Sequence, residues 1–233
     1  MRMTGVREWR MIGLAVIGLL LAPAPARAGI TLSELIVDLQ PGKVLREDVE
    51  VWNNSPERSF VSIEPREIIN PSLPTQSDRK DPDPEKLGLL VEPSRMILEP
   101  GQRRLVRIAA LSANVEREHV YRVTIKPVVG AIRSEESGLK VVIGYDVLVL
   151  VRPAQPAPHV TATRSGRKLT FDNSGNVSVE VVDGRQCAAA HTRCTELPGK
   201  RLYPGATWTV DLPSDLPAEY TLKSPGRSDH ATY

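Results

Sequence analysis

The most constraining segment of this chain is a run, residues 139–151, in which every odd position is apolar. These positions are Leu139, Val141, Ile143, Tyr145, Val147, Val149 and Val151. The alternation predicts a β-strand, because successive side chains of a strand point to opposite faces. Such a strand would extend about 40 Å, well over twice the common length, so one end is expected to overhang its domain.

The even positions divide this strand into two halves. Lys140, Val142, Gly144 and Asp146 are mostly polar or small, whereas Leu148 and Leu150 are apolar. The second half is therefore expected to be buried on both faces. Two placements fit the first half: a central strand covered by its own domain, or a sheet edge that offers backbone groups and large side chains to a partner.

The residues before this strand form short Val/Ile/Leu-rich runs between clusters of Pro, Gly, Asn and Asp, a pattern typical of strands. The candidate strands are 30–39, 48–52, 60–63, 87–91, 104–111 and 120–125. Together with 139–151 they predict an immunoglobulin-like β-sandwich over residues 29–152.

A proline-rich segment, residues 153–158, follows the long strand and predicts a short, semi-rigid linker at a domain boundary. Further short strands separated by turns predict a second, smaller β-sandwich over residues 159–233. The predicted fold class is therefore all-β, with two immunoglobulin-like domains.

The segment from Pro71 to Pro84 carries Ser, Asp and Lys between its prolines and has too few apolar residues to form a core element. We interpret it as a loop that is tolerated as an insertion. A docking segment is the alternative.

The N-terminus has the features of a secretory signal peptide. Arg2, Arg7 and Arg10 precede an apolar stretch, Met11–Ala22, and Ala26-Arg27-Ala28 is a cleavage signal. The stretch is too short to span a membrane. Residues 1–28 hold four Arg and one Glu, so their removal lowers the formal net charge from +2 to −1. We therefore expect an exported protein, with neither nucleic acid as a partner nor insertion into the membrane.

The only cysteines are Cys187 and Cys194. An oxidising compartment favours a disulfide between them. The histidines are dispersed, and no nucleophile-elbow, P-loop or dinucleotide-binding motif occurs. We expect no enzyme activity, no metal and no cofactor.

Several segments resemble the PapD-like periplasmic pilus chaperones in order and spacing. They are Leu98-Glu99-Pro100-Gly101, Leu105-Val106-Arg107-Ile108, Glu116-Arg117-Glu118, Tyr121–Ile125 and the long strand ending in Val151-Arg152-Pro153. The resemblance covers residues 30–153, and the C-terminal part is only loosely similar.

The resemblance implies that the chain binds pilus subunits that lack a strand, by inserting alternate residues of the long strand into the subunit groove. The implied donor row is Leu139, Val141 and Ile143, with Tyr145 as a fourth member. It further implies an outer-membrane usher as a possible partner. An uncovered donor edge also predicts self-association at high concentration.

The resemblance also implies an ion pair between Glu118 and Arg152 that holds the two domains at a fixed angle, with a third, acidic member for which Asp211 and Asp215 are candidates. Relatives grip the subunit's terminal carboxylate with two basic residues. The aligned positions here are Ile36 and Leu148, which cannot bind a carboxylate, so Lys126, Arg122 or Lys140 are candidate substitutes.

A function of a different class shares the leader, the strands and the cysteines: a structural sandwich, such as a pilus subunit or an adhesion module. An N-terminal strand already paired within the first sheet would favour the chaperone.

Overall fold

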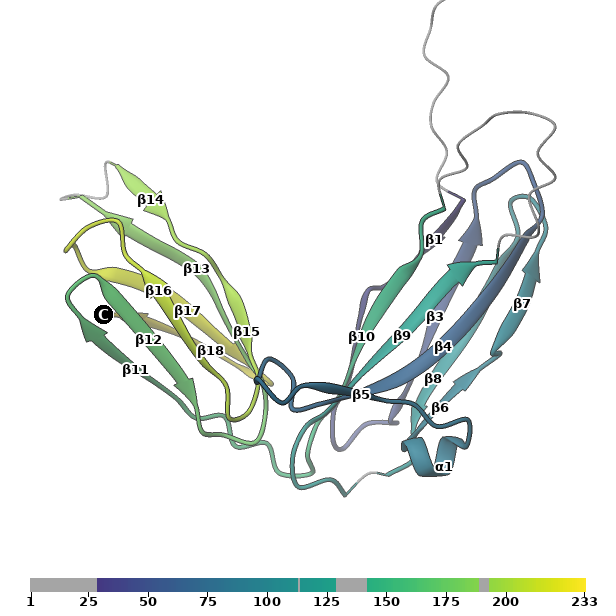
Figure 1. Cartoon of the computed structure of the whole chain (residues 1–233), viewed down its shortest axis with the longest axis horizontal. Helices are drawn as coiled ribbons and strands as arrows, with labels where there is room; N and C mark the ends of the chain where they lie inside the picture. The colour runs from purple at the N-terminus through teal and green to yellow at the C-terminus, as the bar shows by residue number, and fades with distance from the viewer. Residues whose placement is uncertain (1–28, 113, 129–141, 189–192) are drawn as a thin grey trace, which may run out of the picture.

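The computed structural model describes residues 29–112, 114–128, 142–188 and 193–233. These residues form two β-sandwiches that meet at one end and diverge, so the backbone is V-shaped (Figure 1). The open angle between the two arms is called the cleft below. The predicted fold class is confirmed. The predicted signal peptide, residues 1–28, lies outside the described residues.

The N-terminal sandwich pairs a four-stranded sheet with a six-stranded one. The first has the order β1 (Ile30–Leu32), β3 (Arg46–Asn53), β8 (Arg103–Ala110), β6 (Leu89–Glu92). The second has the order β2 (Ile36–Leu39), β10 (Tyr145–Val151), β9 (His119–Pro127), β4 (Ser59–Ile69), β5 (Ser77–Arg79), and β7 (Arg95–Leu98) also pairs with β4. Alternate residues of the strands, such as Val49, Val123 and Val149, fill the space between the sheets.

The chain changes sheets between β1 and β2. Ile30 is fully buried and pairs with Asn53 of β3, whereas β2 runs parallel to β10 in the other sheet. This second pairing begins only at Leu148, which lies opposite Ile36. The first residues of β10 therefore have β9 on one side and no strand partner on the other within the described part of the chain.

The C-terminal sandwich is smaller. One sheet has the order β11 (Val160–Ser165), β12 (Lys168–Asn173), β16 (Thr207–Asp211). The other has the order β14 (Cys194–Glu196), β13 (Val179–Cys187), β17 (Ala218–Ser224), β18 (Arg227–Thr232), and β15 (Lys200–Leu202) pairs with β13.

Aromatic side chains compensate for the small size of this second core. Phe171 is fully buried and meets Tyr220 and Tyr233 edge-on at ring-centroid distances of 5.2 and 5.4 Å. Trp208 stacks on it at 5.8 Å. Aromatic pairs add about 0.5–1.5 kcal/mol beyond the area that they bury.

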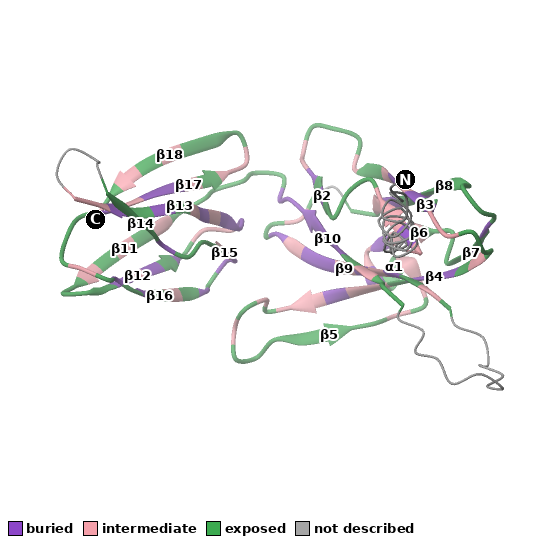
Figure 2. Ribbon diagram, turned by 90° about the horizontal axis from the view of Figure 1, so that it is seen from above, coloured by how far each residue is buried: buried purple, intermediate pink, exposed green. Residues whose placement is uncertain are grey.

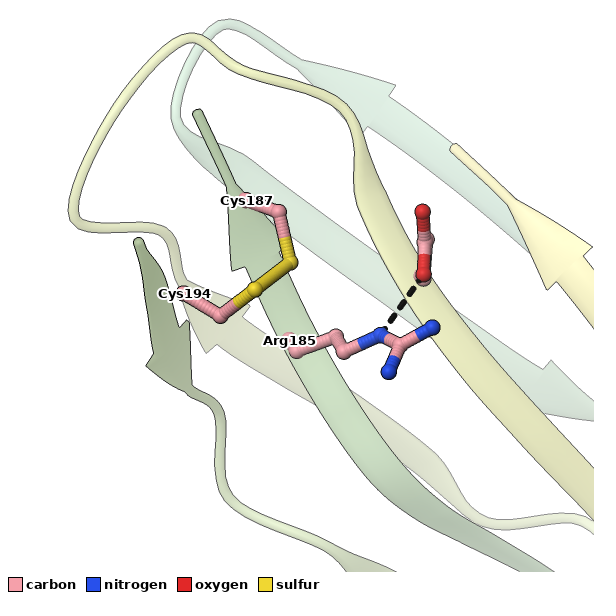
Figure 3. Close-up of a disulfide and its surroundings, with 4 residues drawn as sticks. Arg185, Cys187 and Cys194 are labelled. Carbon is pink, nitrogen blue, oxygen red and sulfur yellow. Dashed lines mark hydrogen bonds and ion pairs between the residues drawn. A yellow bond between two sulfur atoms is a disulfide. The ribbon is translucent and has the colours of Figure 1, made fainter. Parts of the chain in front are cut away.

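The predicted disulfide between Cys187 and Cys194 is confirmed, with an S–S distance of 2.07 Å (Figure 3). It joins the end of β13 to the start of β14, where the two residues are direct cross-strand neighbours. Arg185, two residues earlier on β13, forms an ion pair with Glu219 of β17 at 2.7 Å. The bridge thus closes a hairpin at the far end of the smaller sandwich.

The segment Pro71–Pro84, predicted to be a loop, is not a loop throughout. Residues 77–79 form β5, which pairs with the end of β4. Asp83 then caps a short helix, α1 (Pro84–Leu87), by accepting a hydrogen bond from the Glu85 N–H at 3.0 Å. Asp followed by Pro is a helix-start signal, and Gly88 ends the helix with a φ of 85°.

Candidate functional site

The start of β10 forms an open sheet edge at the mouth of the cleft. Ile143 lies just before it and is 51% exposed, and Val142 is 38% exposed. Ile143 has the same parity as Val147 and Val149, which are fully buried in the core. The apolar row of the domain core therefore continues past the sandwich into solvent. Leu139 and Val141, the other predicted donor residues, lie outside the described residues, as does Lys140.

Tyr145 does not belong to the exposed part of this row. Its ring is half-buried against the N-terminal core, and its hydroxyl donates to the Ile30 carbonyl oxygen at 2.9 Å. Its side chain therefore already has partners within its own domain, and the role of Tyr145 as a fourth donor residue stays a prediction. Of the predicted strand 139–151, only Tyr145–Val151 forms a strand within the described residues.

The cleft-facing side of the second sheet carries four cross-strand neighbours in register: Arg66 on β4, Arg122 on β9, Leu148 on β10 and Ile36 on β2. Leu148 is buried and Ile36 is half-exposed, so this end of the row is apolar. The positive charges lie one and two strands away from the apolar pair.

Arg66 is fully engaged by neighbouring carboxylates. It binds both carboxylate oxygens of Asp146 at 2.9 Å and Asp78 of β5 at 2.9 Å. Burial acts to raise the pKa of Asp146, but hydrogen bonds from Arg66 and Thr124 outweigh it and lower that pKa. Arg66 of β4 therefore forms side-chain contacts with β5, β9 and β10 of the same sheet.

Arg122 and Lys126 differ in how far they are already paired. Lys126 forms an ion pair with Glu64 at 3.1 Å. Arg122 donates to the Asp146 backbone carbonyl at 3.1 Å, and its Nε is 4.0 Å from the Asp146 carboxylate, which Arg66 already binds. Of the two described substitutes for a carboxylate anchor, Arg122 is thus the one with more capacity to bind a further anion.

The joint between the domains contains a buried charge cluster. Arg152 forms an ion pair with Glu118, and their side chains are 4% and 0% exposed. The Ser178 backbone N–H donates to Glu118 Oε2 at 3.0 Å, and Arg152 Nη1 donates to Ser178 Oγ at 3.1 Å. Because Ser178 immediately precedes β13, the cluster connects the two sandwiches.

The acidic third member of this cluster is Asp38 of β2. Arg152 Nε donates to Asp38 Oδ1 at 2.7 Å and Nη2 to Oδ2 at 3.2 Å. The nomination of Asp211 or Asp215 was therefore wrong: Asp211 lies on β16 beside Lys168, and the second domain contributes Ser178 instead. Burial acts to lower the pKa of Arg152, but the two carboxylates outweigh it and raise that pKa.

The contact between the domains also includes an apolar cluster, hereafter the seam, and hydrogen bonds to the residues that follow β10. Tyr203 of the second domain packs with Val120, Leu148 and Leu150 on the outer face of β9 and β10, and its burial raises the pKa of its hydroxyl. The Asn176 amide donates to the Gln155 carbonyl at 3.0 Å and accepts from the Ala157 N–H at 2.7 Å. Residues 155 and 157, between β10 and β11, are therefore bound to the second domain, whereas the Ala154 N–H donates to the Val115 carbonyl of the first at 3.1 Å.

The comparisons with known proteins agree with this geometry. The sequence profile of the pili and flagellar-assembly chaperones, PapD N-terminal domain, matches residues 30–157. The chain belongs to this chaperone family. A search of curated proteins gave no match.

Solved structures of fimbrial chaperones share the fold of both domains. The class 5 fimbriae chaperone CfaA is 24% identical, with a TM-score of 0.64 over 87% of this chain and 98% of that one. The Salmonella enterica SafB chaperone, in complex with the SafA pilin, is 18% identical, with a TM-score of 0.62 over 90% and 99%. The E. coli chaperone DraB is 14% identical, with a TM-score of 0.59 over 88% and 96%.

Two further findings concern the residues that the structure describes. Within the described residues, no helix is long and apolar enough to cross a membrane. The same residues contain no group of three or more His, Cys, Asp or Glu side chains placed to hold a metal ion.

Proposed function

We propose that this chaperone captures pilus subunits that lack a β-strand and completes them with the segment that leads into β10. The observation that carries the proposal is the open edge before Leu148, where the apolar row of the core continues into the exposed Ile143. An exposed edge with a large apolar side chain is an arrangement that monomeric proteins normally avoid. The activity is binding, with no covalent step.

The donor row supplies both affinity and register. Backbone groups of the edge pair with the subunit strand, and alternate side chains enter its groove. Full burial of Leu139, Val141 and Ile143 contributes about 1.5–3 kcal/mol each, roughly 5–9 kcal/mol in total before the costs of association and ordering. That range is enough for a stable but reversible complex.

The subunit's terminal carboxylate is proposed to bind Arg122. Arg122 lies in the cross-strand row of Leu148 and Ile36, one strand from Leu148 and two from Ile36, the two positions that the family resemblance aligns with basic residues. Tyr203 of the second domain packs against Leu148, the cross-strand neighbour of Arg122, which supports a position of Arg122 near the contact between the domains. A carboxylate there would end beside the domain joint.

The cellular setting follows from the leader and the family. We propose that residues 1–28 are removed on export, and that the protein acts in the periplasm and hands subunits to an outer-membrane usher. The open edge would also pair with a second copy of the chain at high concentration.

A structural subunit is the second candidate, and the first strand disfavours it. Ile30 is fully buried and β1 is paired with β3, so the first described strand is an integral part of the first sheet. A subunit needs a detachable N-terminal extension to join its neighbour.

The proposed function is tested by co-expressing the tagged chain in the periplasm with a pilus subunit that lacks its last strand. We expect a one-to-one complex on size-exclusion chromatography and subunit that stays soluble. Equal solubility of the subunit with and without the chaperone would contradict the proposal.

A further inference from the structure

A hairpin formed by residues 67–79, hereafter the strap, projects from the N-terminal sandwich toward the second domain. It consists of the end of β4 paired with β5, with Glu67 opposite Arg79 and Ile69 opposite Ser77. In the view of Figure 1 it crosses the base of the cleft, and Figure 2 shows its tip reaching the C-terminal sandwich beside β15 and β16.

The tip of the strap is folded so that it presents one apolar side chain. The Leu73 N–H donates to the Asn70 carbonyl at 3.1 Å, and the Gln76 N–H donates to the Leu73 carbonyl at 3.0 Å. The Ser72 N–H is bound by the Gln76 side chain at 2.8 Å. These bonds order a segment whose composition alone predicts disorder.

Two apolar residues of the strap, Leu73 and Ile68, contact the interdomain region. Leu73 packs against the hydrophobic core of the second domain, the cluster that contains Leu202 and Tyr220. Ile68 packs against the seam that joins Tyr203 to β9 and β10. The strap therefore spans the joint without a covalent connection.

The base of the strap is fixed to the N-terminal sandwich. Arg79 donates to the buried Glu67 carboxylate through Nε at 2.7 Å, and to the Lys86 carbonyl at 3.0 Å. Arg66 binds Asp78 at 2.9 Å. Since its base is held by ion pairs and by α1, the strap is positioned to transmit force between the domains.

We propose that the strap is a second interdomain connection, which fixes the angle of the cleft and closes one of its two sides. Domains joined by a short linker with a modest interface are expected to move relative to each other. A second attachment, distant from the linker, removes the rotation that a single joint permits.

The position of the strap also defines how the cleft is entered. In the second sheet β5 lies at one edge and β2 with the open part of β10 at the other. The strap occupies the β5 side, so a partner approaches the cleft from the β10 side. This inference concerns the free protein and does not depend on the proposed function.

The test compares the full chain with Leu73→Asp by small-angle X-ray scattering and by thermal unfolding. The matched control is Val44→Asp, which places the same charge in another loop, at a valine that is 73% exposed. We expect Leu73→Asp to lengthen the maximum dimension, to broaden the distance distribution and to separate one unfolding transition into two. Val44→Asp should match the wild type.

Superimposable scattering and an unchanged single transition in Leu73→Asp would overturn the proposal. Leu73→Ser, which removes the contact without adding a charge, provides the same comparison if Leu73→Asp lowers the soluble yield. Circular dichroism that shows unchanged strand content separates a released strap from a misfolded domain.

Discussion

Ser178, at the start of the second sandwich, donates its backbone N–H to the buried carboxylate of Glu118 in the first, at 3.0 Å. The same carboxylate is paired with Arg152. One buried acid thus binds a charge of its own domain and the backbone of the other, so the ion pair lies at the contact between the two sandwiches.

We predict that Arg152→Ala destabilises the protein by about 3–5 kcal/mol, because it leaves buried Glu118 and the neighbouring Asp38 without their counter-charge. Urea unfolding measures the loss. Arg185→Ala, which removes an exposed ion pair, is the control and should cost about 0–1 kcal/mol. Equal losses in the two variants would show that the buried cluster has no special role.

We predict that Ile143→Asp abolishes capture of a pilus subunit, because it places an unpaired carboxylate in an apolar groove. Val142→Asp is matched in charge and sits next to it, but in a strand extended to pair with a subunit its side chain would point to the other face. It should retain most binding. Both variants should keep the wild-type melting temperature, since both residues are exposed. Similar capture by the two variants would remove the donor role of Ile143.

We predict that Arg122→Ala weakens capture of subunits with a free terminal carboxylate by about ten- to a hundredfold, the effect of losing a charge-assisted hydrogen bond of about 1.5–3 kcal/mol. A subunit extended by a few residues at its C-terminus should bind both proteins equally. Lys126→Ala is the control, since Lys126 is paired with Glu64. An identical effect on the extended subunit would argue against carboxylate binding.

We predict that replacing both Cys187 and Cys194 by Ser destabilises the second sandwich by about 2–3 kcal/mol, the chain-entropy value for so short a loop. Hydrogen exchange should show the larger loss of protection in residues 159–233 and a smaller one in β3 and β8 of the first sandwich. A loss of equal size in β3 and β8 would contradict the assignment of this stabilisation to the second sandwich.

We predict a loss of stability in mild acid that depends on Glu67. Burial acts to raise the pKa of Glu67, but hydrogen bonds from His119 and Arg79 outweigh it and hold that pKa below its ordinary value of 4.5. Its contribution is therefore complete above pH 4.5 and is lost as the pH falls through the folded-state pKa. Glu67→Gln should have a lower melting temperature than the wild type above pH 4.5, and this difference should become smaller as the pH falls below 4.5. The exposed Glu47→Gln should leave the acid dependence unchanged.

The strand pattern and the disulfide were predictable because both depend on local information. Alternation in residues 139–151 and paired cysteines after an export signal are visible within a few residues. Asp38 was not predictable, because 114 positions separate it from Arg152 and only the parallel pairing of β2 with β10 brings them together.

The strap and Tyr145 show a second limit of sequence patterns. The proline- and aspartate-rich composition of residues 71–84 predicts disorder, but Arg79 and Leu73 find partners that no local pattern reveals. Tyr145 is included in the donor row only because it occupies an odd position of the alternating run. The hydrogen bond of its hydroxyl to the Ile30 carbonyl, which no sequence pattern reveals, shows that it also packs against the core of its own domain.

The short pairing of β2 with β10 determines where a strand added to β10 can end. Because β2 occupies the edge from Leu148 onward, any strand added to β10 must stop at that residue. Partners of different sequence would therefore be aligned to the same end point, so the length of the strand that each one contributes is measured from the base of the cleft and not from its mouth.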